Sequence, residues 1–256
     1  PASRRLARWS DPILRIKRIH LMKRLIQPAL VLATLAFVAA PALTPPFTGY
    51  DPAIFPVVIA RPSIQPAGYA FAIWGLIYLW LIFHSGFGLL QRRGDAGFMR
   101  PALPLLAAIA LGTVWLAIAG AFPIIATLTI LIIAALAIFA YLRADQMQDR
   151  WLLAAPLAIF AGWLTAAAAV STGVIIAGYG LLSDTGSAIM MLIAVLLLAL
   201  TVQTKRPLMP VYGATVFWAI IGVVVVNWGQ NPTVSYAALL GAAQMALATL
   251  VLRLRK

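Results

Sequence analysis

Eight apolar stretches, each about as long as a bilayer is thick, dominate the chain. A helix needs ~20 apolar residues to cross the hydrocarbon core. Stretches of this kind lie at about residues 25–43, 67–90, 102–122, 124–142, 152–176, 187–204, 208–228 and 234–252. Hydrophobic residues make up 63% of the 256 residues and charged residues only 10%, which is outside the range of soluble domains. The sequence therefore predicts an all-α polytopic membrane protein with about eight transmembrane helices.

The division between the third and fourth spans is the least obvious one. Apolar sequence runs almost without a break over residues 101–142, which is twice the length that one crossing needs. Proline removes a backbone donor and clashes with the preceding helical turn. We therefore expect the chain to reverse in a tight hairpin at Phe122 and Pro123.

Basic residues gather in every second loop and at both ends of the chain. If both termini are cytoplasmic, every lysine and arginine except Arg61 falls on the cytoplasmic side, as the positive-inside rule requires. We expect a multi-pass protein of a bacterial inner (cytoplasmic) membrane. The net charge of +13 then belongs to one membrane face, so no nucleic-acid partner is expected.

The first 24 residues alternate apolar and basic side chains before the first span begins. This pattern predicts a basic amphipathic segment that lies in the membrane interface. Such a segment either retains the amino terminus on the anionic cytoplasmic face or docks onto a partner or a specific lipid. We treat residues 1–24 as a unit separate from the membrane-spanning part.

Acidic side chains are missing from the predicted spans. All six acids are aspartates in loops or in the amino-terminal segment, and neither glutamate nor cysteine occurs. Proton-coupled carriers commonly use a carboxylate within the membrane, so a classical secondary transporter is not expected. The sequence also has no carboxylate pair, no zinc or serine-hydrolase motif and no phosphate-binding loop. We expect neither an enzyme nor a metal site.

A proline-rich loop at residues 44–65 separates the first two spans. Five prolines stiffen it without giving it regular structure. It either links the two helices at the outer surface or folds over a cavity as a lid.

The second span begins with aromatic residues where aliphatic ones would suffice. Phe71, Trp74, Tyr78, Leu81 and Ser85 recur at helical spacing, so they share one face, and Trp74 and Tyr78 are expected to stack. Their rings offer flat apolar faces with one polar group each. They either line a pocket for a planar ligand or anchor the helix at the membrane interface.

Two sequence motifs resemble those of the TspO/MBR family, the translocator protein or tryptophan-rich sensory protein group. The first is RPSIQPAGYAFAIWGLIY at residues 61–78, and the second is PLAIFAGWLTAA at residues 156–167. The resemblance covers roughly residues 25–177. Ser171 stands where the family commonly has asparagine, and residues 178–256 add three helices that five-helix members lack, which indicates a longer, divergent member.

The resemblance implies a five-helix bundle whose pocket, capped by the first loop, binds a hydrophobic ligand. Such a ligand would be a tetrapyrrole (haem, porphyrin or bacteriochlorophyll), a carotenoid or a sterol-like lipid. Trp218 in the seventh span either projects into the same interior or faces lipid. The residues that we expect to line the pocket are Tyr69, Phe71, Trp74, Tyr78, Trp115, Trp163, Thr165 and Ser171.

His84 is a separate candidate, because an imidazole within a membrane span needs a partner or a function. It lies on a different helix face from Trp74 and Tyr78, together with Ile73 and Trp80. Three explanations are open: a hydrogen bond to a neighbouring carbonyl or hydroxyl, axial ligation of a tetrapyrrole metal, or contact with a headgroup or a subunit.

Two classes of function follow from these features. The first is a TspO-like protein that binds, and thereby transports or senses, a hydrophobic small molecule. The second is a non-catalytic accessory subunit of a larger respiratory or photosynthetic membrane complex. Membrane lipids are expected partners in both cases, and the small-residue helix faces suit either a homo-oligomer or a larger complex.

Overall fold

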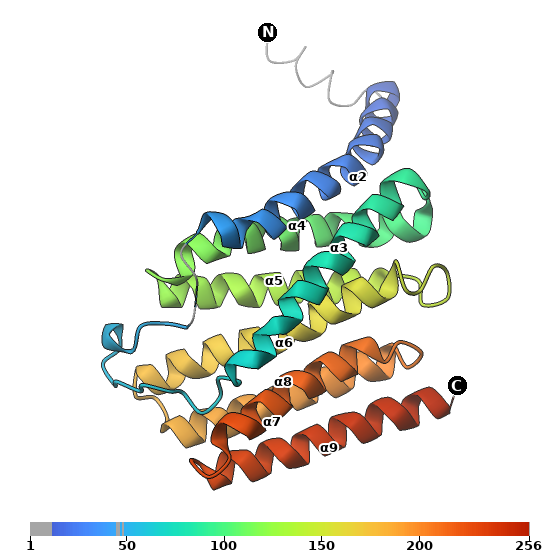
Figure 1. Cartoon of the computed structure of the whole chain (residues 1–256). Helices are drawn as coiled ribbons and strands as arrows, with labels where there is room; N and C mark the ends of the chain where they lie inside the picture. The colour runs from blue at the N-terminus through green and yellow to red at the C-terminus, as the bar shows by residue number, and fades with distance from the viewer. Residues whose placement is uncertain (1–11, 45–46, 48, 256) are drawn as a thin grey trace.

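The computed structural model describes residues 12–44, 47 and 49–255, with side chains from Leu25 onward. This part of the chain is all helical and contains no strand (Figure 1). It comprises eight α-helices and two short 3-10 helices: α2 (Pro12–Leu43), η1 (Pro52–Ile54), η2 (Gly68–Ala72), α3 (Ile73–Leu90), α4 (Ala96–Ala119), α5 (Pro123–Arg143), α6 (Ala154–Gly178), α7 (Asp184–Lys205), α8 (Val211–Asn227) and α9 (Pro232–Leu254).

The number of helices agrees with the eight predicted spans. By length and composition, seven of them can cross a membrane, and η2 together with α3 counts as one span, Gly68–Leu90. The eighth, α8, is apolar but has only 17 residues, which corresponds to ~25 Å at 1.5 Å per residue. The prediction of an all-α polytopic membrane protein is confirmed.

Residues 12–24 of the predicted interfacial segment form the helical start of α2, so their backbone is continuous with the first span. Residues 1–11 lie outside the described part of the chain. Figure 1 shows α2 bending before it joins the bundle. Pro28 lies inside this helix, and an internal proline is a common cause of such a bend.

The predicted reversal between the third and fourth spans is confirmed. Helix α4 ends at Ala119, and Pro123 occupies the first turn of α5, where its missing N–H has no helical partner to lose. The Trp115 indole N–H donates to the carbonyl of Ala126 at 2.8 Å. This hydrogen bond ties the two arms of the hairpin together.

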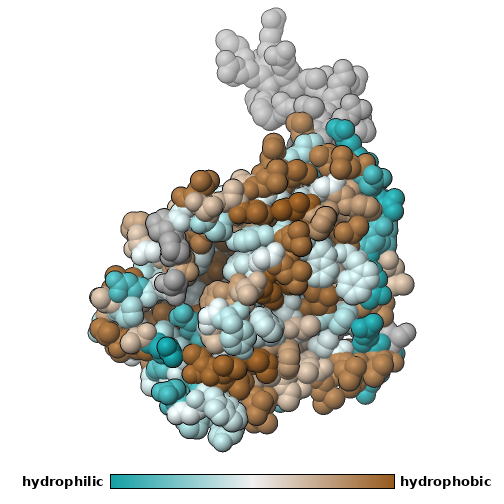
Figure 2. Space-filling model, viewed as in Figure 1, coloured by the Kyte–Doolittle hydropathy of each residue, from teal (hydrophilic) through white to brown (hydrophobic). Residues whose placement is uncertain are grey.

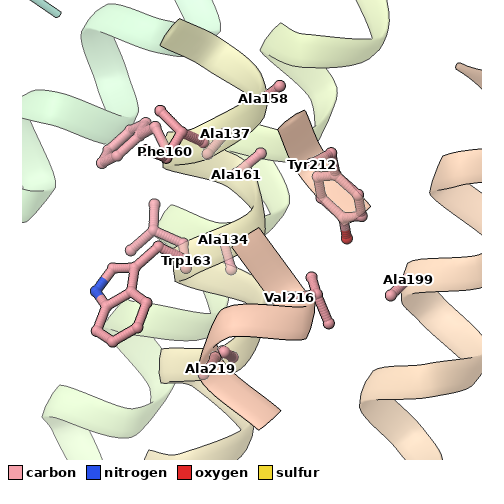
Figure 3. Packing of buried hydrophobic residues seen from close by; sticks show 14 of the residues in the cluster. Ala134, Ala137, Ala158, Phe160, Ala161, Trp163, Ala199, Tyr212, Val216 and Ala219 are labelled. Atoms are coloured by element: carbon pink, nitrogen blue, oxygen red, sulfur yellow. The ribbon is translucent and has the colours of Figure 1, made fainter. Parts of the chain in front are cut away.

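Helix α6 is the centre of the bundle. It packs against α5, α7 and α8, while α3 crosses over it. Figure 3 shows Phe160 and Trp163 pointing away from Tyr212 and Val216 of α8, so α6 presents large side chains on one side and packs closely on the other. A Cβ at Gly162 would lie 2.9 Å from the Tyr212 carbonyl oxygen. Glycine is therefore what allows α6 and α8 to approach.

One hydrophobic core extends from Leu30 in α2 to Met245 in α9. Packing is thus continuous across residue 177, where the sequence suggested a division into a bundle of residues 25–177 and three additional helices. That division stays a prediction. Large apolar side chains also cover the outer surface of the helices, as a protein in contact with lipid requires.

The loops rich in basic residues gather at one end of the bundle. The α3–α4, α5–α6 and α7–α8 loops and the end of α9 lie at one end, which appears as the hydrophilic right edge of Figure 2. Arg92 and Asp149 join two of these loops by an ion pair of 2.7 Å. The hydrogen bond and the charge of Asp149 raise the pKa of Arg92. The basic loops thus share one end of the bundle, and its cytoplasmic orientation stays a prediction.

A cavity walled by aromatic residues and the first loop

A cavity of about 570 Å³ lies inside the bundle, next to α6. Aromatic side chains from four helices and from the loop between α2 and α3 form much of its wall. These are Phe37, Phe47, Tyr50, Phe71, Trp74, Tyr78, Trp115, Phe160 and Trp163. Such a volume falls within the ~300–1,000 Å³ that is usual for small-molecule sites.

Helices α7 and α8 complete the cavity wall, so the expectation of a pocket between the first five helices alone is wrong. Leu192 and Val195 come from α7, and Ala219, Ile220 and Val223 come from α8. The reason is the position of α6, which packs against both of these helices while α3 crosses it. The last three helices therefore belong to the candidate site.

Trp74 and Tyr78 stack as predicted, with ring centroids 5.3 Å apart and planes inclined by 23°. Phe37 meets both rings edge-on, at 5.9 and 5.4 Å. Trp163 lies edge-on to Trp74 and to Phe71. The predicted stacking is thus confirmed, and Phe71, Trp74 and Tyr78 line the cavity, whereas Leu81 and Ser85 of the same predicted face do not.

Six of the eight predicted pocket residues line the cavity: Phe71, Trp74, Tyr78, Trp115, Trp163 and Ser171. Tyr69 and Thr165 do not. Tyr69 is 45% exposed and packs on Trp218, and the Thr165 hydroxyl lies 3.0 Å from that of Tyr212, facing α8.

Tyr69 and Thr165 each lie two residues along the helix from a residue that does line the cavity, and this spacing explains why neither faces it. Two residues correspond to ~200° of rotation on an α-helix, so Thr165 points away from the side that carries Trp163. In the tighter η2, Tyr69 likewise lies on the other side from Phe71. Trp218, for which two orientations were open, does not line the cavity and donates its indole N–H to the Ala70 carbonyl at 3.0 Å.

His84 lies away from the cavity. Its Nδ1 is 2.8 Å from the carbonyl oxygen of Leu152, and its ring stacks on Phe98 at 5.4 Å. The side chain is buried. These contacts match the first of the three explanations, a hydrogen bond to a neighbouring carbonyl, and they leave axial ligation of a cavity ligand without structural support.

Trp80, on the same side of α3 as His84, is also directed away from the cavity. It stacks on Trp151 and donates its indole N–H to the Trp151 carbonyl at 2.7 Å. The two tryptophans of α3 therefore have different surroundings, although both side chains are half-buried.

The loop between α2 and α3 forms one wall of the cavity. Phe47, Gly49, Tyr50 and Ile64 line it, together with Gln65 and Pro66 at the start of the next segment. Of the two alternatives for this loop, a simple surface link is thus excluded by geometry, since the loop folds over the cavity.

Three hydroxyl groups, of which those of Tyr50 and Ser171 line the cavity, join this loop to the bundle. The Tyr50 and Ser171 hydroxyls lie 2.6 Å apart, and that of Ser171 lies 2.7 Å from that of Thr127. Tyr50 also approaches Thr127 at 3.4 Å. Sequence reasoning missed Tyr50 and Thr127, because nothing in a proline-rich loop indicates which side chain will turn inward.

A second set of hydrogen bonds holds the carboxyl-terminal part of the loop. The backbone N–H of Ser63 donates to Asp184 Oδ1 at 2.9 Å, and its carbonyl accepts from Asn227 Nδ2 at 2.8 Å. Asn231 Nδ2 donates to the Ser63 hydroxyl at 3.1 Å. The loop is thereby attached to the start of α7, to the end of α8 and to the residue that precedes α9.

The described lining of the cavity carries no charged side chain and no histidine, cysteine or methionine. Its polar groups are hydroxyls, one amide from Gln65, the indole N–H groups of three tryptophans, and backbone. Among the described residues, no group of three or more histidines and acids could hold a metal ion. The cavity therefore suits a neutral, flat and mainly apolar molecule, oriented by a few hydrogen bonds.

Comparison with known proteins identifies the family. The family described as TSPO-like protein matches residues 30–251, which includes α7, α8 and nearly all of α9 as well as the first five spans. No curated protein and no solved structure matched the chain. Because the match covers well over half of its length, the chain belongs to the TSPO-like protein family.

Proposed function

We propose that this membrane protein binds a planar, ring-containing hydrophobic molecule of the metal-free tetrapyrrole class in the aromatic cavity. The observation that carries the proposal is the stacked pair of Trp74 and Tyr78, which lines an uncharged cavity under the loop. Flat rings stack on indole and phenol rings and gain ~0.5–1.5 kcal/mol per pair beyond the burial of their area. Transport or sensing would follow from binding and release at this site.

The chemistry of the lining supports a metal-free ring over a metal complex. Iron in a haem takes a histidine, cysteine, methionine or tyrosine ligand, and of these the described lining offers only the phenols of Tyr50 and Tyr78. The Tyr50 hydroxyl is already hydrogen-bonded to Ser171. A ring with its own N–H groups needs hydrogen-bond acceptors, which the cavity hydroxyls supply.

The binding test uses the full chain, purified alone in mild detergent and titrated with protoporphyrin dimethyl ester, a metal-free tetrapyrrole that has no ionised carboxylate. We expect one molecule per chain, a shift of the porphyrin absorption band and quenching of tryptophan fluorescence, because three tryptophans line the cavity. A chain that leaves the absorption band unchanged, and that is recovered only with other subunits, would instead favour the accessory-subunit alternative.

Tyr50→Phe tests whether the loop controls access to the cavity. The substitution keeps the ring and removes the hydroxyl that meets Ser171 and Thr127. Losing one such hydrogen bond costs ~1 kcal/mol, so we expect the porphyrin to dissociate about fivefold faster in stopped-flow measurements, with a smaller change in the rate of association.

Tyr179→Phe is the matched control for this variant. Tyr179 packs its ring on Phe55 of the same loop at 5.8 Å but does not line the cavity. We expect it to leave the dissociation rate unchanged. Equal acceleration in both variants would show that the Tyr50 hydroxyl has no specific role in holding the loop closed.

A further inference from the structure

A second concave site lies at the basic end of the bundle, remote from the aromatic cavity. It is a groove of about 480 Å³ between the start of α4, the end of α5, and the α5–α6 and α7–α8 loops. Arg100, Arg143 and Arg206 line it, and Asp145 is the only acidic residue among the described ones that line it. We refer to it as the arginine groove.

The positive charge of the arginine groove is not neutralised within the described part of the chain. None of the three arginines makes an ion pair there, since the ion pair found is between Arg92 and Asp149. Hydrogen bonds from the backbone N–H groups of Met147 and Gln148 lower the pKa of Asp145, so it stays ionised. The Asp145 carboxylate, which already accepts two backbone hydrogen bonds, is thus the one negative charge beside three guanidinium groups in the described lining.

One of the three guanidinium groups, that of Arg206, is partly removed from water, which costs free energy. Arg206 is half-buried, and the loss of contact with water lowers the pKa of its guanidinium, partly offset by Tyr141 and Asp145. A guanidinium group stays charged in proteins, so an incoming anion would replace the water that Arg206 has lost. Guanidinium groups bind phosphate oxygens by paired hydrogen bonds.

Two buried polar atoms beside the arginines have no hydrogen-bond partner among the described residues. They are the hydroxyl of Tyr141, near enough to Arg206 to interact with it electrostatically, and Oε1 of Gln146 in the groove wall. Buried polar groups are normally hydrogen-bonded. The Gln146 amide can donate to an anion in the groove after rotating by 180°, whereas the Tyr141 hydroxyl does not line the groove.

The surroundings of the groove favour a lipid over a soluble anion. Arg143 is the last residue of the span α5, and its guanidinium lies 5.0 Å from the ring centroid of Phe139, which is half exposed on the outside of that helix. Leu142 and Leu208 add apolar wall. An amphiphile with its phosphate in the groove would therefore find an apolar helix surface for its acyl chains.

We propose that the arginine groove binds the phosphate-containing headgroup of an anionic membrane phospholipid. Basic pockets between transmembrane helices bind such headgroups. The site is independent of the aromatic cavity, and its ligand differs from a planar ring in charge and in shape.

Native mass spectrometry of the full chain in detergent tests this proposal, with phosphatidylglycerol and phosphatidylcholine of equal acyl length as probes. We expect tighter binding of phosphatidylglycerol than of phosphatidylcholine. The double variant Arg143→Gln/Arg206→Gln should bind phosphatidylglycerol about twenty-fivefold more weakly than the unchanged chain. The matched control, Arg253→Gln/Arg255→Gln, removes two charges from the end of α9, outside the groove. It should leave the affinity within about twofold of the unchanged chain.

Three results would overturn the proposal. Equal loss in both double variants would mean that only general surface charge matters, and equal binding of the two lipids would mean that the groove does not select negative charge. Displacement of the lipid by excess inorganic phosphate would make a soluble phosphate the ligand. Should the groove variant fail to fold, Arg143→Gln alone changes only an exposed side chain and is expected to weaken binding about fivefold.

Discussion

Replacing Trp74 by alanine is expected to weaken porphyrin binding about thirtyfold, which corresponds to ~2 kcal/mol, the usual cost of losing a central aromatic contact in a binding site. The indole stacks on Tyr78, meets Phe37 and Trp163 edge-on, and lines the cavity. Its removal takes away the flat surface on which a ring would lie. Equilibrium titration followed by the porphyrin absorption band measures the effect.

Trp80→Ala is the matched control on the same helix. Trp80 is half-buried like Trp74, but it stacks on Trp151 and does not line the cavity. We expect it to change the affinity less than twofold, although it removes just as large a ring. Equal weakening by the two substitutions would contradict the assignment of the ligand to the Trp74 face of α3.

Gly222→Ala is expected to reduce both stability and porphyrin affinity, because an added Cβ has no room. It would lie 2.7 Å from Pro66 Cβ and 3.1 Å from Ala70 Cβ. Overpacking of this kind costs ~1–3 kcal/mol. The Ala67 N–H also donates to the Gly222 carbonyl at 3.0 Å, so η2 and α3 would be pushed away from α8, and Phe71 and Trp74 would be displaced.

Gly75→Ala makes the same substitution where there is space, since nothing lies within 4 Å of the position that a Cβ would take. Alanine also favours a helix over glycine by ~1 kcal/mol. We expect this variant to be at least as stable as the unchanged chain in a thermal unfolding assay and to bind porphyrin normally. Equal losses in both variants would mean that the contact between η2 and α8 does not shape the cavity.

The elements that the sequence predicts well are those that depend on local pattern. Apolar length fixes the helices, since each must satisfy its own backbone hydrogen bonds in lipid. Pro123 marks the α4–α5 hairpin for a local steric reason. The spacing of Trp74 and Tyr78 places them on one face of α3, since four residues make about one helical turn, and Phe71 precedes Trp74 by one turn of three residues in η2.

The features that the sequence does not predict depend on contacts between segments that are distant in the chain. The α7 and α8 wall of the cavity follows from close packing around α6, for which Gly162 leaves room. That contact joins segments ~50 residues apart in sequence, so no short-range pattern reports it. The same holds for the meeting of Tyr50, Thr127 and Ser171, which brings a loop and two helices together.

The loop between α2 and α3 makes more hydrogen bonds to the bundle around Ser63 than around Tyr50. Around Ser63, four hydrogen bonds to aspartate and asparagine side chains attach the loop to α7, to α8 and to the residue that precedes α9. Around Tyr50, two hydroxyl contacts and the edge-on contact of Phe47 with Trp115 attach it, and farther along the Val57 N–H donates to the Gly178 carbonyl at 2.9 Å. We therefore expect the segment around Tyr50 to separate from the bundle more readily than the segment around Ser63, which would open the cavity beside Thr127 of α5 and Ser171 of α6.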